Sequence, residues 1–252
     1  NIQPPSCFGA ANGRVEVVGI NGGMEPMLYS LDGENFSPRS FFANLEAGNY
    51  RLWVQDANGC ELDTIVLLEH PTALVLSMGN NDEIQLGDSK LLNPQINQDL
   101  SALDTFYWAP ADGLDCLTCW PVSVQPSATT TYQLTVVDSF GCVVEERSTV
   151  NVRKERRVFI PSAFSPNGDG INERFTVYAG PEVAEIKSFR VFDRWGELVF
   201  ERVGFLPNQE LEGWDGRLGG QLIKNKVYIY YAEIRFVDGW EELHQGDVTL
   251  VR

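Results

Sequence analysis

Three groups of residues in this sequence carry side chains able to do chemistry: five cysteines, two histidines, and a loop rich in asparagine and aspartate. His70 and His244 lie far apart, and no Gly-x-Ser-x-Gly elbow, His-Glu-x-x-His helix or phosphate-binding glycine loop accompanies them. Glycosidase chemistry needs only two carboxylates, which 35 acidic residues always allow. The sequence predicts no catalytic residue and no cofactor, and a catalytic domain preceding Asn1 is an open alternative.

Cys116 and Cys119 form a Cys-x-x-Cys pair that stands between a glycine turn and Trp120. A redox-active pair of this kind needs a thiolate of low pKa at the start of a helix, in a βαβ context. A zinc site needs four ligands, and no histidine stands near these two cysteines and Cys142. We therefore predict a small structural disulfide between Cys116 and Cys119.

The loop rich in asparagine and aspartate predicts a tight chain reversal that presents polar side chains outward. It consists of Pro166, Asn167, Gly168, Asp169, Gly170 and Asn172. Oxygen atoms of Asn167, Asp169 and Asn172 would suit calcium, but the spacing differs from that of an EF-hand, which has glycine at its sixth position and glutamate at its twelfth. The sequence favours a plain turn, with a calcium site as the alternative.

The elements that position these residues belong to an acidic, well-packed chain of 252 residues with 43% hydrophobic residues and a formal charge of −16. Nucleic-acid binding is disfavoured, because it needs clustered Lys and Arg to neutralise phosphates. The basic run at residues 153–157 is interpreted as a linker, with contact to an anionic polymer as the alternative. No apolar stretch approaches the roughly 20 residues that span a bilayer, so membrane attachment is expected through a partner protein or a later modification.

An internal repeat organises the first two thirds of the chain. Residues 50–60 and residues 132–142 share the spacing Tyr-x-Leu-x-Val-x-Asp-x-x-Gly-Cys. Each predicts an alternating strand, a turn with Asp and Gly, and a second strand that begins at Cys. Because turn residues recur throughout and no amphipathic helix is evident, the pattern predicts an all-β chain of three consecutive small Ig-like β-sandwich modules. We expect them at residues 1–71, 72–153 and 154–252.

The first two predicted modules contain motifs of known exported proteins. Residues 7–60 hold an opening Cys, then Ala-Asn-Gly, Tyr-Ser-Leu-Asp-Gly, Leu-x-Ala-Gly-x-Tyr and Asp-Ala-Asn-Gly-Cys, and they resemble the SprB-type repeat of Bacteroidetes surface proteins. This resemblance implies a structural disulfide between Cys7 and Cys60, with two free thiols as the alternative. Residues 106–136 resemble PKD-like or Ig-like modules of the same proteins. Cys142 is then the odd cysteine, either buried and free or paired elsewhere.

The third predicted module carries four motifs in order: the loop described above, Phe-Asp-Arg-Trp-Gly, Gly-Trp-Asp-Gly, and a closing strand. It closely resembles the gliding-motility-associated C-terminal domain, which is the type B sorting domain of the type IX secretion system. Glu173 departs from that family, which usually has Asp at this position. Besides the loop residues, the motifs supply these candidates for sorting and partner binding: Trp195, Gly196, Trp214, Asp215 and Gly216.

The closing strand supplies the remaining candidates, which are Val248, Thr249, Leu250, Val251 and Arg252. A terminal strand has no downstream chain to shield its edge, so we expect that a partner can extend the sheet there by main-chain pairing. The resemblance implies recognition by the type IX translocon and attachment to the outer membrane, at the cell surface, through a PorP/SprF-type protein.

The rest of the chain is expected to support that display. Since the chain begins at Asn1 without a signal peptide, we expect a fragment whose export signal lies upstream. The first two modules are expected to act as a stalk. The alternative is an adhesin whose modules bind a glycan or a surface through aromatic residues such as Tyr29, Phe36 and Trp53.

Overall fold

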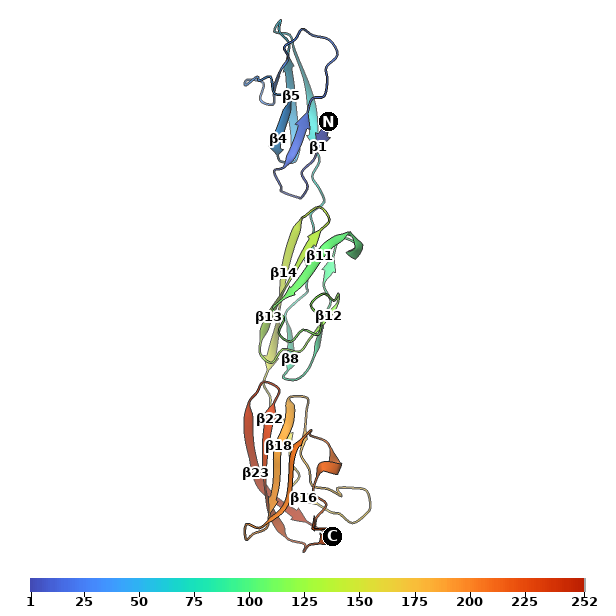
Figure 1. Cartoon of the computed structure of the whole chain (residues 1–252), viewed down its shortest axis with the longest axis vertical. Coiled ribbons are helices and arrows are strands. Elements are labelled where there is room, and N and C mark those ends of the chain that lie inside the picture. The colour runs from blue at the N-terminus through green and yellow to red at the C-terminus, as the bar shows by residue number, and fades with distance from the viewer. Residues whose placement is uncertain (252) are drawn as a thin grey trace. The chain divides into compact units, whose positions relative to one another are not determined.

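The computed structural model describes residues 1–251 and consists of strands joined by turns (Figure 1). Its helical segments are the two short 3-10 turns Leu100–Ala102 and Glu210–Glu212. The predicted all-β fold is therefore confirmed. In the described part of the chain, no helix has the length and apolar character needed to cross a membrane. Arg252, a predicted partner-binding residue, lies outside the described residues.

The strands follow one another along the whole chain. Residues 1–71 form β1 (Ile2–Gln3), β2 (Gly13–Glu16), β3 (Leu28–Ser30), β4 (Phe41–Leu45), β5 (Gly48–Gln55) and β6 (Glu61–Leu68). Residues 72–153 form β7 (Leu76–Ser77), β8 (Asp82–Gln85), β9 (Lys90–Leu92), β10 (Gln95–Ile96), β11 (Leu103–Ala109), β12 (Val122–Val124), β13 (Thr130–Asp138) and β14 (Val143–Arg153). The remaining strands are β15 (Val158–Phe159), β16 (Ala163–Phe164), β17 (Tyr178–Ala179), β18 (Val183–Phe192), β19 (Leu198–Phe205), β20 (Arg217–Leu218), β21 (Gln221–Leu222), β22 (Val227–Phe236) and β23 (Glu241–Leu250).

The chain divides into two compact units that do not follow the predicted module boundaries. One unit holds residues 1–78, 94–108 and 133–146, and the other holds residues 79–93, 109–132 and 147–252. The division of the chain into modules at 1–71, 72–153 and 154–252 stays a prediction.

In the first unit, residues 1–68 form two three-stranded sheets, ordered β1-β2-β4 and β3-β5-β6. Their alternating side chains meet in a small core of Val15, Leu52, Val66 and Leu68. The two turns predicted from the internal repeat are both present, since Gln55 pairs with Glu61 at the end of the β5–β6 hairpin and β14 starts directly after Cys142. The repeat was therefore correctly interpreted as strand, turn and strand.

The disulfides differ in part from the prediction. Cys116 and Cys119 are bonded, as predicted, with 5.5 Å between their Cα atoms. The prediction of a bond between Cys7 and Cys60 is wrong, because Cys7 bonds Cys142 within the first unit, and Cys60 is free and exposed. Cys142, the odd cysteine of the sequence, thus pairs with the opening Cys of the SprB-like segment.

Strand geometry explains why Cys60 cannot reach Cys7. A Cβ atom placed on Gly13 would lie 2.6 Å from the Leu68 side chain and 3.1 Å from Pro5, so the segment that leads to Cys7 packs at the Leu68 end of the β5–β6 hairpin. Cys60 lies at the opposite end of this hairpin, beside Glu61. Eight residues of extended strand separate the two ends by about 23 Å, whereas the Cα atoms of bonded Cys7 and Cys142 are 5.5 Å apart.

In the second unit, residues 158–251 build their own core. A five-stranded sheet in the order β16-β23-β22-β18-β19 supplies most of the buried side chains. β22 lies in the middle and pairs with β18 on one side and β23 on the other. Its alternate residues Tyr228, Ala232, Ile234 and Phe236 are almost completely buried, which gives this sheet one face on the core and one toward solvent.

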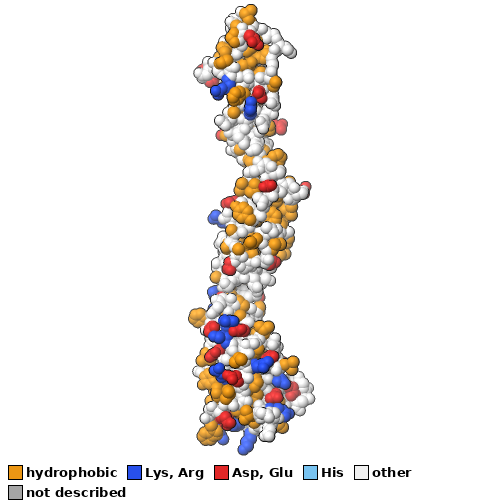
Figure 2. All heavy atoms as spheres, viewed as in Figure 1, with side chains coloured by type: hydrophobic (Ala, Val, Ile, Leu, Met, Phe, Trp, Pro, Cys, Tyr) orange, Lys and Arg blue, Asp and Glu red, His pale blue; other side chains and the backbone are white. Residues whose placement is uncertain are grey.

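The basic run at residues 153–157 is an ion-paired segment of the second unit. Lys154 and Arg156 both bond the carboxylate of Asp238, at 3.0 and 2.7 Å, and Arg156 also lies over the rings of Phe236 and Trp240. Burial disfavours the ionised form of Asp238. The hydrogen bonds from Lys154 and from the Trp240 backbone, together with the charge of Arg156, nevertheless lower the pKa of Asp238. On the visible face, basic and acidic side chains are intermixed in this part of the chain (Figure 2). The alternative of an anionic-polymer site is disfavoured, because these cations already have carboxylate partners.

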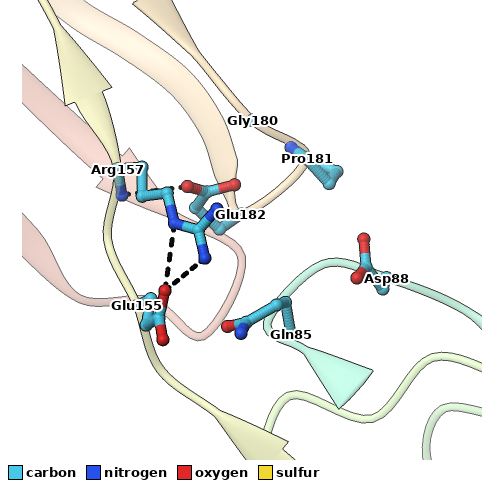
Figure 3. Close-up of a pocket in the computed structure, with 7 residues that line it drawn as sticks. All are labelled: Gln85, Asp88, Glu155, Arg157, Gly180, Pro181 and Glu182. Atoms are coloured by element: carbon cyan, nitrogen blue, oxygen red, sulfur yellow. Dashed lines mark hydrogen bonds and ion pairs between the residues drawn. The ribbon is translucent and has the colours of Figure 1, made fainter.

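A small pocket lies beside this segment (Figure 3) and is lined by Gln85, Asp88, Glu155, Arg157, Gly180, Pro181 and Glu182. The guanidinium of Arg157 bonds Glu155, while its backbone N–H donates to buried Glu182 at 2.9 Å. Next to the pocket, Gly87 has φ +89° and approaches the backbone of Pro181 so closely that a Cβ would lie 2.4 Å from its carbonyl carbon. Only glycine satisfies both the positive φ and this approach.

The disulfide assignment predicts a specific result in peptide mapping. Digestion without reduction should yield one peptide pair joined through Cys7 and Cys142, and a Cys60 peptide that is alkylated by a thiol reagent. Mass spectrometry of the chain and of its Cys60→Ser variant measures both, and the variant should keep the same cross-linked pair. A Cys7–Cys60 peptide pair would contradict the structure.

The close contact at Gly87 predicts that two glycine-to-alanine substitutions lower the free energy of unfolding by different amounts. Gly239→Ala meets no atom within 4 Å at a φ of +80°, so it should cost only the backbone strain of about 1 kcal/mol. Gly87→Ala adds a clash with fixed backbone and should cost about 1–3 kcal/mol more. Urea unfolding of both variants measures the difference, and equal losses would show that the close approach is absent in solution.

Candidate functional site

Most of the predicted partner-binding residues meet at one end of the sandwich formed by residues 158–251, near the C label of Figure 1. The end of β23 joins this region, because the Leu250 N–H donates to Lys226 O at 3.1 Å and the Val251 N–H donates to Phe164 O at 3.0 Å. Lys226 bonds Asp193 in the β18–β19 turn at 3.2 Å. The loop at residues 166–172 is closed at its base by a bond from Ser165 N to Asn172 O. Separate sequence motifs thus converge on one surface.

The loop at residues 166–172 is a turn held together by its own side chains. Asn167 Oδ1 accepts the N–H of Asp169 at 3.0 Å, and Asp169 Oδ1 accepts the N–H of Ile171 at 2.8 Å. Glu173 closes the loop, since its Oε1 accepts the N–H groups of Gly168 and Gly170. Sequence reasoning treated Glu173 only as a departure from the family, although its longer side chain reaches both amides.

Two of the residues considered as calcium ligands, Asn167 and Asp169, take part in these hydrogen bonds. The hydrogen bonds from the Asn167 side chain and the Ile171 backbone hold the pKa of Asp169 below its usual range, so it is ionised. Its Oδ2 accepts the side-chain amide of Asn167 at 2.9 Å. The side-chain oxygens of Asn167 and Asp169 therefore accept backbone and amide donors, and among residues 1–251 no cluster of three or more His, Cys, Asp or Glu is placed to hold a metal ion. These contacts fit the plain turn that the sequence favours, and the choice between a plain turn and a calcium site stays a prediction.

The two tryptophans of the predicted site have different environments. Trp214 is 1% exposed, packs against Phe164 and Tyr228, and donates its indole N–H to Arg217 O at 3.0 Å. Its indole is therefore part of the hydrophobic core. Trp195 is 80% exposed at the tip of the β18–β19 turn, with the guanidinium of Arg194 over its ring. Of the two, Trp195 is available to a partner.

Trp195 belongs to a turn type that is found at three places among residues 1–251. Asp193 Oδ1 accepts the N–H groups of Trp195 and Glu197, as Asp56 Oδ1 accepts those of Asn58 and Cys60. Asp138 makes the same pair of bonds in the β13–β14 turn. Burial opposes ionisation of Asp193, but the bonds from the Trp195 and Glu197 backbones and from Lys226 lower its pKa. Sequence reasoning found two copies, and the shorter pattern Asp-x-x-Gly would have revealed the third.

The closing strand does not have the open edge that was expected at residues 248–251. β16 pairs with it in parallel, through Ala163 opposite Thr249 and Phe164 opposite Leu250. The side chains of Val248 and Leu250 are buried in the core. The expectation of an unshielded edge at this place is therefore wrong, because a strand from earlier in the chain returns to cover it.

A known family model matches the part of the chain that contains these residues. Residues 158–250 match the model of the CHU_C type IX secretion signal domain. The match covers less than half of the chain and begins and ends with the core described above. It indicates a sorting domain of a secreted protein, which interacts with the secretion machinery.

The similarities to solved structures are distant. No curated protein matches the chain. The chain is similar to latent PorU from Porphyromonas gingivalis, at 12% identity and a TM-score of 0.27, over 81% of this chain and 24% of that chain. It is also similar to the immunoglobulin domains 1–5 of Sidekick-1 (10% identity, TM-score 0.39, over 89% and 51%) and to a tetra-tandem repeat of a large adhesion protein (11%, 0.35, over 100% and 73%). The chain thus spans about a quarter of the PorU chain and half of the Sidekick-1 chain, and such distant likeness carries no functional argument.

The different burial of the tryptophans predicts different costs of truncation. Trp214→Ala removes a fully buried indole and should lower the free energy of unfolding by about 3–5 kcal/mol. Trp195→Ala removes an exposed one and should change it by less than about 0.5 kcal/mol. Urea unfolding of the two variants measures this, and a large loss for Trp195→Ala would contradict its exposed position.

Proposed function

We propose that residues 158–252 are a recognition signal for type IX secretion that also attaches the protein to the outer membrane through a PorP/SprF-type partner. The main support is the family match at residues 158–250. The independent core of this region is consistent with a signal read in folded form, because its buried residues all come from the matched segment. The partner-binding surface is proposed to be the end of the sandwich that presents Trp195 and the loop at residues 166–172.

The preceding residues are proposed to act as a stalk that holds an upstream domain away from the cell surface. The disulfide between Cys7 and Cys142 supports this, because it cross-links the SprB-like segment to the segment that follows it. An adhesin that binds glycan through its aromatic residues is the weaker proposal. Trp53 illustrates this: the guanidinium of Arg51 lies 4.6 Å from its ring, and Gly33 packs against the same indole. Sugar stacking needs a free aromatic face, which these contacts reduce.

The proposal predicts that residues 158–252 are a sufficient address. Fused to an exported fluorescent reporter in a type IX-competent bacterium, they should display the reporter on the surface, whereas residues 1–157 should not. Display should be lost when the PorP/SprF-type partner is deleted. Protease accessibility of the reporter on intact cells measures both results. A reporter held in the periplasm in every strain would refute the assignment, and display without the partner would refute the attachment route.

A further inference from the structure

We propose that the edge of β23 at residues 241–247 is a docking strand, to which a basic, extended segment of the secretion machinery adds by main-chain pairing. This inference rests on the proposed function and adds a second partner contact to the end of the sandwich that presents Trp195. It moves the pairing edge from the closing residues, which β16 covers, to the preceding stretch of the same strand.

The register of β22 and β23 shows which backbone groups face outward. The Phe236 N–H donates to Trp240 O, and the Leu250 N–H donates to Lys226 O, so even-numbered residues of β23 bond β22 throughout the unbroken register. Odd-numbered residues point their N–H and C=O groups the other way. Thr249 demonstrates this direction, because its N–H donates to Ser162 O at 2.9 Å on the side of β16.

β16 covers only the end of this edge. It pairs with Thr249 and Leu250 and with no earlier residue of β23. Within the described chain, no backbone partner on the outer side is found for the odd-numbered residues, which are Glu241, Leu243, Gln245 and Asp247. All four are exposed, with Leu243 at 55%. The edge therefore offers a regular row of unpaired donors and acceptors, which is what strand addition requires.

The opposite edge of the same sheet is less suitable. β19 pairs with β18 through a register shift at Val191 and Phe192, and Gly204 within it has φ +64°. Irregularities of this kind twist an edge away from pairing and are a common protection of sheet edges. β23 has no register shift against β22 along its paired length. The β19 edge of the same domain therefore provides a control for experiments on the β23 edge.

The charges on the β23 edge indicate the chemistry of the partner. Glu241, Glu242 and Asp247 lie along it, and Lys187 bonds Glu241 at 2.8 Å. His244 Nε2 lies 3.6 Å from Glu242 Oε1, and among the described residues no Lys or Arg forms an ion pair with Glu242 or Asp247. Opposite charges on adjacent strands stabilise pairing, and like charges oppose it. The edge therefore disfavours pairing with a second copy of itself and favours a segment that carries Lys or Arg.

Proline substitution tests the main-chain contact on the full chain fused to the surface reporter. Gln245→Pro removes an outward N–H that the fold does not use, and such edge positions tolerate proline. Display should fall by about tenfold or more, since the added strand loses a hydrogen bond and meets the ring. Val203→Pro makes the same change at an exposed residue of the irregular β19 edge and should display within about twofold of the parent.

Charge reversal tests the partner's chemistry with the same reporter. Asp247→Lys should lower display by about tenfold, whereas Asp104→Lys, an equal charge change at an exposed residue of β11, should not lower it. Equal display of the two variants would refute a basic partner segment.

Crosslinking tests the same contact without a proline substitution, and so does not depend on whether a proline variant folds. A photoreactive residue at Leu243 should give an adduct with a protein of the secretion machinery, and one at Val203 should not. If the parent chain is displayed but Leu243 gives no adduct, or Gln245→Pro displays like the parent while folded, the docking edge is refuted and the sorting function stands. If the parent chain itself is not displayed, both proposals fail.

Discussion

The hydrogen-bond register of β22 is the constraint on which the described site depends. Its odd-numbered residues bond β18 and its even-numbered residues bond β23, so a single ten-residue strand fixes which side chains of three strands enter the core. A shift by one residue would expose Tyr228, Ile234 and Phe236 and bury Glu233 and Arg235. The same register determines that the outer backbone groups of β23 belong to its odd-numbered residues. Core, exposed face and open edge are thus consequences of one pairing.

Local sequence patterns were sufficient for the strands and most turns, because their causes are local. The turns at Asp56 and Asp138 form because an aspartate oxygen accepts two nearby backbone amides and a glycine three residues later adopts a positive φ. A pattern of a few residues contains all of this information. The same holds for Cys116 and Cys119, whose separation of three residues brings the two sulfur atoms within bonding range.

Contacts between distant parts of the chain could not be predicted in this way. The partner of Cys7 depends on which end of the β5–β6 hairpin the first 13 residues pack against. No sequence motif contains that information. Likewise, the burial of Trp214 and the exposure of Trp195 depend on tertiary packing, although both residues stand in similar glycine-containing motifs. The shielding of Thr249 and Leu250 by β16 requires a parallel pairing between segments at the two ends of the domain. Sequence spacing alone does not determine such pairings.

The bond between Cys7 and Cys142 has a mechanical consequence for a chain that is pulled from both ends. Tension applied at Asn1 passes through the sulfur atoms and bypasses the intervening chain, because the two cysteines are 135 residues apart in sequence but covalently joined. Fully extended, a segment of that length would add roughly 450 Å of slack. While the bond is intact, this slack cannot be released, even if every strand between the two cysteines loses its pairing. Under load, the segment between the two cysteines would therefore add no length to the chain until a reductant, and not force alone, cleaves the disulfide.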